Sequence, residues 1–395
     1  MEPLKGVKVL DCSTLLPGPY CTMMMQTMGA EVIKVEPPYG DFLRKMLPEC
    51  FALLNRGKKS VVLNLKEPRG REIFCRMAKD ADVMLEGFRP GVAEKLGIGF
   101  EKIRSINPTI IYVSISGYGQ SGPYVSHPGH DIDFQAVSGL VSITGEPENQ
   151  KGTPAGFQAS DIAGGMFALT SILAALLGKE RGEEWKALHL DVSMTDSLIA
   201  WMIPRIVEYF ARGMPNRSDF MARGSYGIFE AKDGKYFSLG VVEEHFWERL
   251  CRLVDAPDLL EDPELKSWEG RNRNSHRILP RLEKAFLKKG RDDWLQLLWN
   301  ANIPAAPVNE IKDVVRDPQV RFRGLIGVDE ENRFSAEKTK PFPVKELTKD
   351  NAGSSVPGLG EHTEQILKGL GYSDKEIEEL YEVGVIKGVK AGEEC

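Results

Sequence analysis

The chain has 395 residues, and its 51 lysines and arginines against 57 aspartates and glutamates leave a formal net charge of −6. At roughly 150 residues per domain, this length predicts two or three domains with a large buried core. The acidic balance argues against a nucleic acid as the main partner. The six cysteines lie far apart without a C-x-x-C pair, so the sequence predicts neither a disulfide framework nor a bound metal.

Two features bear on location. Charged residues at Glu2, Lys5 and Lys8 interrupt any apolar leader, so no secretory signal is expected and the chain is predicted to be cytoplasmic. The longest nearly apolar run, 162–177, is shorter than the roughly 20 residues that a membrane span needs. We therefore expect a buried helix there and no membrane partner.

The first half of the chain alternates β-type and helical patterns, starting with an apolar strand at 7–10 and a helix at 19–28. Strands spaced by helices favour right-handed βαβ crossovers, so we predict an α/β fold with a Rossmann-like parallel sheet. The further expected strands are 31–35, 60–65, 83–85, 110–115 and 189–192, and the further expected helices are 68–78, 91–96, 101–106, one beginning near Asp161, and 195–210.

The pattern changes after residue 212, where the N-terminal part of the large domain (1–212) is predicted to end. Residues 213–227 have the composition of a linker, and 228–325 predict a smaller α+β domain with helices at 245–254, 280–288 and 292–301. Residues 326–395 are expected to return to the large domain, as a linker followed by C-terminal helices that pack on it. The last of these helices begins with a capping box, Ser373-x-x-Glu376.

One glycine motif resembles a dinucleotide-binding fingerprint, and the residues after it decide whether it is one. Gly117–Gly122 matches G-x-G-x-x-G directly after an expected strand. A dinucleotide fingerprint must open a helix whose N-terminus holds the pyrophosphate, but Pro123 and Pro128 follow without helical periodicity. We interpret the segment as a glycine-rich loop.

Basic residues follow several of the expected strands. Lys66 lies beyond one strand, and Arg89 and Lys95 lie beyond the next. In a parallel sheet, the loops at the carboxyl ends of the strands line the ligand crevice. The placement favours a phosphorylated ligand, although any one of these residues would also suit a solvated surface.

A possible acid/base group lies in the block Gly129-His130-Asp131-Ile132-Asp133, with Asp161 further along the chain. Asp161 is equally compatible with a first-turn acid that interacts with its helix dipole. His130 is equally compatible with a structural histidine. The spacing alone does not bring His130 and Asp161 together.

Short motifs spread along the chain carry a resemblance. One of them is Phe88-Arg-Pro-Gly91. The full set lies at residues 4–11, 17–19, 29–37, 55–58, 88–91, 303–308, 317–320 and 360–363. In content and order they resemble those of the class III coenzyme A transferase family (CaiB/BaiF type), which contains formyl-CoA transferase, the carnitine CoA-transferase and α-methylacyl-CoA racemase. The resemblance implies the family fold, an interlocked homodimer and an acyl-CoA substrate, with no cofactor beyond the CoA moiety.

The same resemblance implies site residues. The family's reactive aspartate corresponds to Asp161. Where transferases of the family have an arginine just after the position of Glu36, this chain has prolines, and Arg44 is the expected substitute. The implied CoA contacts are Leu15, Leu16, Lys66, Arg89, Lys95, Arg44 and, beside His130, Asp131.

Two chemistries occur in the family. In transferases the aspartate attacks a thioester and passes through an anhydride and an enzyme-bound CoA thioester. Racemases resemble this chain more closely, because they combine a Gly-His-Asp-Ile block, the later aspartate, and a glutamate in a segment similar to that around Glu243. Inversion at the α-carbon needs a base on one face and an acid on the other, and His130 and Asp161 fit these roles.

Glu243 would orient His130, from the same or the partner subunit, and backbone amides at the start of the Asp161 helix would stabilise the enolate. The sequence thus predicts racemisation or epimerisation of a 2-methylacyl-CoA. The alternatives are a CoA transferase that uses Asp161 as nucleophile and a non-catalytic acyl-CoA-binding protein.

Overall fold

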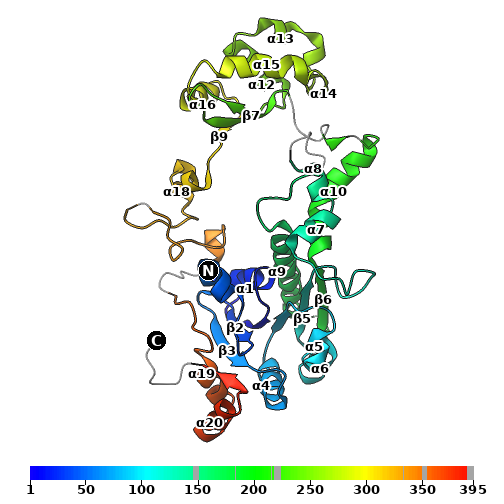
Figure 1. Cartoon of the computed structure of the whole chain (residues 1–395), viewed down its shortest axis with the longest axis vertical. Helices are drawn as coiled ribbons and strands as arrows, with labels where there is room; N and C mark the ends of the chain where they lie inside the picture. Colours follow the sequence, from blue (N-terminus) through cyan, green and yellow to red (C-terminus); the bar gives the residue numbers. More distant parts are fainter. Residues whose placement is uncertain are drawn as a thin grey trace. The chain divides into compact units, whose positions relative to one another are not determined.

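A computed structural model describes residues 1–145, 151–182, 184–214, 216–217, 224–331, 333–348 and 354–388. The chain forms two compact units: the first comprises Met1–Ala211 and Gln319–Cys395, and the second comprises Arg212–Pro318 (Figure 1). The second unit begins and ends earlier than the predicted range 228–325. Within the predicted linker, residues 215 and 218–223 lie outside the described residues, whereas Tyr226 already pairs with Gly240 in a strand.

The first unit is built on a seven-stranded sheet in the order β10-β3-β2-β1-β4-β5-β6. All neighbours are parallel except the pair β10 and β3. The predicted mixed α/β fold with a mostly parallel sheet is confirmed. The strands are β1 (Lys8–Cys12), β2 (Glu31–Glu36), β3 (Lys59–Leu63), β4 (Val83–Glu86), β5 (Ile111–Ser116), β6 (Leu188–Ser193) and β10 (Ile386–Lys387).

Helices cover both faces of this sheet. Proline in the first turn starts both α1 and α4, where its missing N–H costs nothing. The helices are α1 (Pro17–Thr27), α2 (Leu43–Met46), α3 (Pro48–Asn55), α4 (Pro68–Ala78), α5 (Val92–Lys95), α6 (Phe100–Ile106), α7 (Asp131–Val137), α8 (Leu140–Ile143), α9 (Ala159–Glu180), α10 (Met194–Ala211), α18 (Pro318–Arg323), α19 (Thr363–Gly369) and α20 (Asp374–Glu382), with a 3₁₀ turn at Lys345–Leu347.

Two apolar clusters make the core of the first unit. One joins α1 and α9 to the sheet and includes Met24 and Met25, which are fully buried. The other joins α4 to the opposite side of the strands and takes in Leu367 of α19 and Leu380 of α20. Figure 1 shows these two C-terminal helices, in red, near β3. The capping box of α20 is present, with the Ser373 side chain accepting from the Glu376 backbone.

The long helix α9 carries Asp161 in its first turn. A Cβ at Gly165 would lie 2.7 Å from the Pro17 carbonyl oxygen, and one at Gly164 would lie 2.7 Å from Cγ of Met194. Glycine at these positions therefore lets α9 approach the starts of α1 and α10. By length and composition α9 would also be able to cross a membrane, a test that core helices of globular proteins pass as well. Here its Ala163, Ala168 and Ile172 are buried against the rest of the first unit.

The second unit is α+β. An antiparallel sheet of β7 (Tyr226–Glu230), β8 (Tyr236–Gly240) and β9 (Ala305–Pro307) packs with helices around one apolar cluster. The helix expected to start at Pro280 begins at Ser275 and contains that proline. The helices are α12 (Glu244–Leu253), α13 (Pro257–Glu261), α14 (Trp268–Arg273), α15 (Ser275–Phe286), α16 (Arg291–Asn300) and α17 (Ile311–Val314), with a 3₁₀ turn at Pro263–Leu265.

Candidate active site

A cavity of ≈ 250 Å³ opens where the loops after β1, β4 and β5 meet the first turns of α7 and α9; we call it the Asp161 cavity. The sheet order reverses between β1 and β4, and ligands of such sheets bind outside the carboxyl ends of the strands at this reversal. The residues predicted for the site that line this cavity are Leu15, Arg89, His130, Asp131 and Asp161.

Asp161 lies in the first turn of α9 and is held from α7. The Asp131 carboxylate accepts the backbone N–H of Ser160 at 2.7 Å and that of Asp161 at 3.3 Å through the same oxygen, Oδ1. Its other oxygen accepts from the Gln135 amide. Asp131 thus caps α9 from a neighbouring helix, which satisfies orphan N–H groups of the first turn.

These contacts determine the protonation of Asp161. Burial raises the pKa of its carboxyl and the nearby Asp131 carboxylate raises it further, to about 7. At neutral pH the group therefore exchanges readily between the acid and the carboxylate. A carboxyl poised in this way suits general acid and base work.

The cap by Asp131 bears on the expected role of the first backbone amides of α9. The amides of Ser160 and Asp161 were expected to stabilise an enolate, but both point to Asp131. The next amide, that of Ile162, donates to the Gln158 carbonyl at 3.0 Å within the helix. The first amides of α9 are therefore already used inside the protein.

His130 is the residue just before α7. Its backbone N–H donates to the Asp133 carboxylate at 2.9 Å, which fixes the turn that starts the helix. The side chain is exposed and lines the Asp161 cavity. The structure therefore brings His130 and Asp161 to one cavity, which the spacing in the sequence did not.

The loop between β1 and α1 is held under strain. Leu15 has φ of 62°, a left-handed conformation that is costly for a residue with a Cβ. Its N–H donates to Asp41 at 3.3 Å, and the buried Lys34 both pairs with Asp41 at 2.9 Å and donates to the Ser13 carbonyl at 2.9 Å. The buried pair thus holds the part of the loop that lines the cavity.

A second buried pair lies below the same loop. Lys58 is 3.2 Å from Asp11, and Thr22 donates to the same carboxylate at 2.6 Å. Burial alone would raise the pKa of Asp11, but the charges of Lys58 and Lys34 and the hydroxyls of Ser13 and Thr22 lower it to about 2. Asp11 is therefore a permanent anion within a compensated network.

Glu86, which ends β4, was not among the predicted residues. Its carboxylate accepts the N–H of Phe88 at 2.7 Å and a hydrogen bond from Ser114. Burial raises the pKa of Glu86 to about 7 despite these bonds. A lone acid at the end of an apolar strand was the only signal in the sequence, and it did not reveal that Glu86 shapes the turn leading to Arg89.

A larger cavity of ≈ 630 Å³ adjoins this turn; we call it the Lys66 cavity. It is lined by Lys66, by the 36–40 segment with Tyr39, and by Phe88 and Leu96. Thr14 and Phe88 line both cavities. Lys66 and Arg89 were expected in one crevice, and the structure places them in adjoining ones.

Three of the predicted CoA contacts line neither cavity. Leu16 packs against the first core cluster, and Lys95 lies exposed in α5. Arg44 binds Glu36 through two hydrogen bonds of 2.8 and 2.7 Å and donates to the Pro357 carbonyl. Its donors are thus largely engaged within the protein, and its contact with CoA stays a prediction.

Glu243 belongs to the second unit. It is exposed and directly precedes α12. The fully buried Arg271 supports this segment by donating to the Val242 carbonyl, with further bonds to Ser225 and Leu265. A contact between Glu243 and His130 would join the two units, and it stays a prediction.

The glycine motif contributes in another way. No helix follows it directly, since bends and turns lie within residues 117–126 and residues 127–130, also described, have no regular structure. Gly117 and Gly119 line the Asp161 cavity. A Cβ at Gly117 would lie 2.4 Å from the Phe134 ring, so glycine permits the packing of α7 here.

Comparison with known proteins adds to this geometry. The model for "CoA-transferase family III" matches residues 4–363. The chain is 36% identical to acetyl-CoA:oxalate CoA-transferase of Acetobacter aceti, covering 82% of this chain and 85% of that protein. It is 34% identical to human succinyl-CoA:glutarate CoA-transferase (98% and 90%) and 31% identical to human alpha-methylacyl-CoA racemase (98% and 98%).

A solved structure has the same fold. The crystal structure of a CAIB/BAIF family protein from Brucella suis superposes with a TM-score of 0.80 at 30% identity, covering 93% of this chain and 99% of that one.

Proposed function

Since the chain belongs to CoA-transferase family III, we propose that it racemises or epimerises 2-methylacyl-CoA thioesters by proton transfer at the α-carbon, without a cofactor beyond the CoA moiety. The observation that carries this proposal is that His130 and Asp161 line one cavity while the pKa of Asp161 is about 7. A nucleophilic carboxylate has no need of a raised pKa, whereas an acid/base group works best near the ambient pH.

The reaction needs two side chains. With one enantiomer bound, the neutral His130 imidazole removes the α-proton and the protonated Asp161 delivers a proton to the opposite face. The other enantiomer reverses these roles. Because the first amides of α9 are occupied by Asp131 and by the helix itself, stabilisation of the enolate falls to the positive end of the α9 dipole and to donors outside it.

The adjoining cavities suggest how CoA binds. The Lys66 cavity offers Tyr39 and Phe88 for the adenine ring and Lys66 for phosphate, and Arg89 follows at the shared wall. The thioester would then enter the Asp161 cavity past Thr14 and Phe88. In the interlocked homodimer that we also propose, Glu243 orients His130 from one of the two subunits.

CoA transfer between carboxylic acids is the second candidate. It is favoured by the relatives named for such transfers, with oxalate or glutarate in their names. In this reaction the Asp161 carboxylate attacks the thioester carbonyl, CoA leaves as the thiolate, and an acyl-aspartyl anhydride forms. The thiolate then attacks the aspartyl carbonyl, which releases the donor acid and leaves CoA as a thioester of Asp161. The acceptor carboxylate attacks this thioester and displaces the CoA thiolate, which attacks the acceptor's carbonyl in the new anhydride and regenerates the Asp161 carboxylate.

Proton NMR in D₂O separates the two reactions. One enantiomer of a 2-methylacyl-CoA is incubated with the protein without any acceptor acid, and the α-proton and the product configuration are followed. We expect deuterium to enter the α-position with loss of optical purity, and we expect Asp161→Asn and His130→Gln to stop both. His276→Gln, a histidine of the second unit, is the control. No exchange by the wild type, together with a new thioester once succinate is added, would establish the transferase instead.

A further inference from the structure

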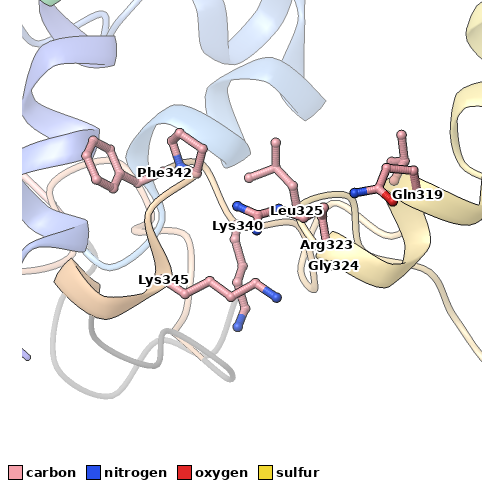
Figure 2. A pocket seen from close by; sticks show the side chains of 9 residues that line it. Gln319, Arg323, Gly324, Leu325, Lys340, Phe342 and Lys345 are labelled. Carbon is pink, nitrogen blue, oxygen red and sulfur yellow. The ribbon is translucent and has the colours of Figure 1, made fainter. Parts of the chain in front are cut away.

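A third pocket lies away from both cavities, on the segment by which the chain returns to the first unit. It has a volume of ≈ 250 Å³ and is formed by α18, by residues 324–325 and by residues 340–345; we call it the Lys340 pocket. None of its lining residues belongs to the Asp161 or Lys66 cavity. Figure 2 shows Arg323, Lys340 and Lys345 around it, with Leu325 and Phe342.

The segment that carries these residues is fastened to the first unit. The largely buried Arg56 donates through its guanidinium to the carbonyls of Ala336, Glu337 and Thr339, the last at 2.9 Å. Phe342 packs against the first core cluster. These anchors fix the backbone from which Lys340 extends.

The walls of the pocket are also tied to each other. The N–H of Lys340 donates to the Leu325 carbonyl at 2.8 Å, and the N–H of Gly327 donates to Thr339 Oγ1 at 3.0 Å. Gly324 has φ of 62°, and a Cβ there would lie 3.6 Å from Nζ of Lys345. The Lys345 ammonium therefore lies against the turn that follows Arg323.

The lining of the Lys340 pocket carries positive charge without an acidic side chain. Its lining contains three cations and no carboxylate. Among the residues that the structure describes, the side chains of Arg323, Lys340 and Lys345 have no ion-pair partner, in contrast to Lys312 and Arg333 of neighbouring segments. Like charges around a small volume repel one another, and an anion bound between them removes that repulsion.

The geometry points to a phosphate-binding site formed by Arg323, Lys340 and Lys345. A guanidinium and two ammonium groups match the multiple charge and the several acceptor oxygens of a phosphate or diphosphate. Leu325, Phe342 and Pro343 add an apolar wall, so the class of ligand is a phosphorylated metabolite with an apolar part. This inference does not depend on the reaction at Asp161.

Calorimetric titration of the full chain with inorganic pyrophosphate tests the site. Saturating CoA is present so that the CoA phosphate contacts are filled. We expect one binding event, weakened at least tenfold in the triple variant R323Q/K340Q/K345Q and weakened by added salt, because the cations are exposed. The charge-matched variant K284Q/K338Q/K375Q, whose lysines line none of the three cavities, should bind like the wild type.

Two results would overturn the proposal. One is that the wild type does not bind pyrophosphate under these conditions. The other is that both triple variants lose the same affinity, which would indicate a general effect of surface charge. Thermal unfolding of each variant verifies that the exposed substitutions leave the fold intact.

Discussion

Asp11 and Asp161 are carboxylic acids of the same unit in opposite electrostatic surroundings. Burial raises the pKa of both, yet that of Asp11 falls to about 2 and that of Asp161 rises to about 7. The difference lies in the neighbouring charges, because Asp11 faces the cations Lys58 and Lys34 whereas Asp161 faces the carboxylate of Asp131.

The contrast indicates that the two carboxyl groups have different roles, one of fixed charge and one that titrates. The Asp11 carboxylate keeps its negative charge near neutral pH because Lys58 and Lys34 face it, and it accepts the N–H of Ser13 in the loop that contains the strained Leu15. The uncompensated region around Asp161 can gain and lose a proton there. Rigid charge pairs thus lie beside a carboxyl that is free to titrate.

The largest expected effect comes from removing the titrating carboxyl. Asp161→Asn should lower the rate of α-proton exchange by about 10³-fold, within the range for loss of a general acid or base. Binding of CoA, measured by calorimetry, should change little. The control is Asp196→Asn, a first-turn acid of α10 that lines neither cavity. Equal rates in the wild type and Asp161→Asn would remove Asp161 from the reaction.

The compensated region should respond in stability rather than in chemistry. Lys58→Met leaves the Asp11 charge buried beside one cation fewer, and we expect a loss of about 3–5 kcal/mol in the free energy of unfolding. Lys59→Met is the matched control, since Lys59 pairs with Glu31 at the surface and should cost less than about 1 kcal/mol. Urea denaturation measures both, and similar losses would contradict the contrast between the two pairs.

Glu86 allows the sign of the pH dependence to be tested. Its pKa is raised from 4.5 to about 7 in the folded protein, so between these values the native state holds a proton that the unfolded state has lost. Stability therefore decreases as the pH rises through this window. At about 1.4 kcal/mol per pKa unit, Glu86 accounts for a decrease of about 3 kcal/mol.

Denaturation of Glu86→Gln at pH 5 and pH 7 provides the measurement. The variant should lose less stability between the two pH values than the wild type does, while Asp161 still contributes a decrease of the same sign. Glu72→Gln, an exposed acid of α4, is the control. Parallel behaviour of Glu86→Gln and the wild type would show that Glu86 does not titrate in this window.

The smallest expected effect separates the two causes of the raised pKa of Asp161. Asp131→Asn keeps an oxygen to cap α9 but removes the negative charge beside Asp161. The pKa of Asp161 should fall by roughly one unit, because a neighbouring like charge is lost while burial remains. The limb of the pH–rate profile that reports Asp161 should move to lower pH by that amount. An unmoved limb would leave burial as the whole cause of the raised pKa.

Most of the regular structure followed from local pattern. The strand spacing, the helix 68–78 and the capping box of α20 were all predictable, because apolar periodicity, first-turn proline and Ser-x-x-Glu act over a few residues. The strand β10 was not, since two residues carry no period and its pairing with β3 closes over a long separation. The helix α7 was also missed, although its cap at His130 and Asp133 was visible in the sequence.

For the site, the sequence by itself determined which side chains are present and, through the order of strands and loops, that Lys66 and Arg89 follow the carboxyl ends of strands. Only the tertiary structure decided that His130 meets Asp161 in one cavity, that Asp131 caps α9, and that Asp11 faces lysines whereas Asp161 faces the Asp131 carboxylate. The physical reason is that burial and charge are properties of neighbours in space. A pattern along the chain determines helices and strands, whereas a pKa depends on which charges folding brings within a few ångströms.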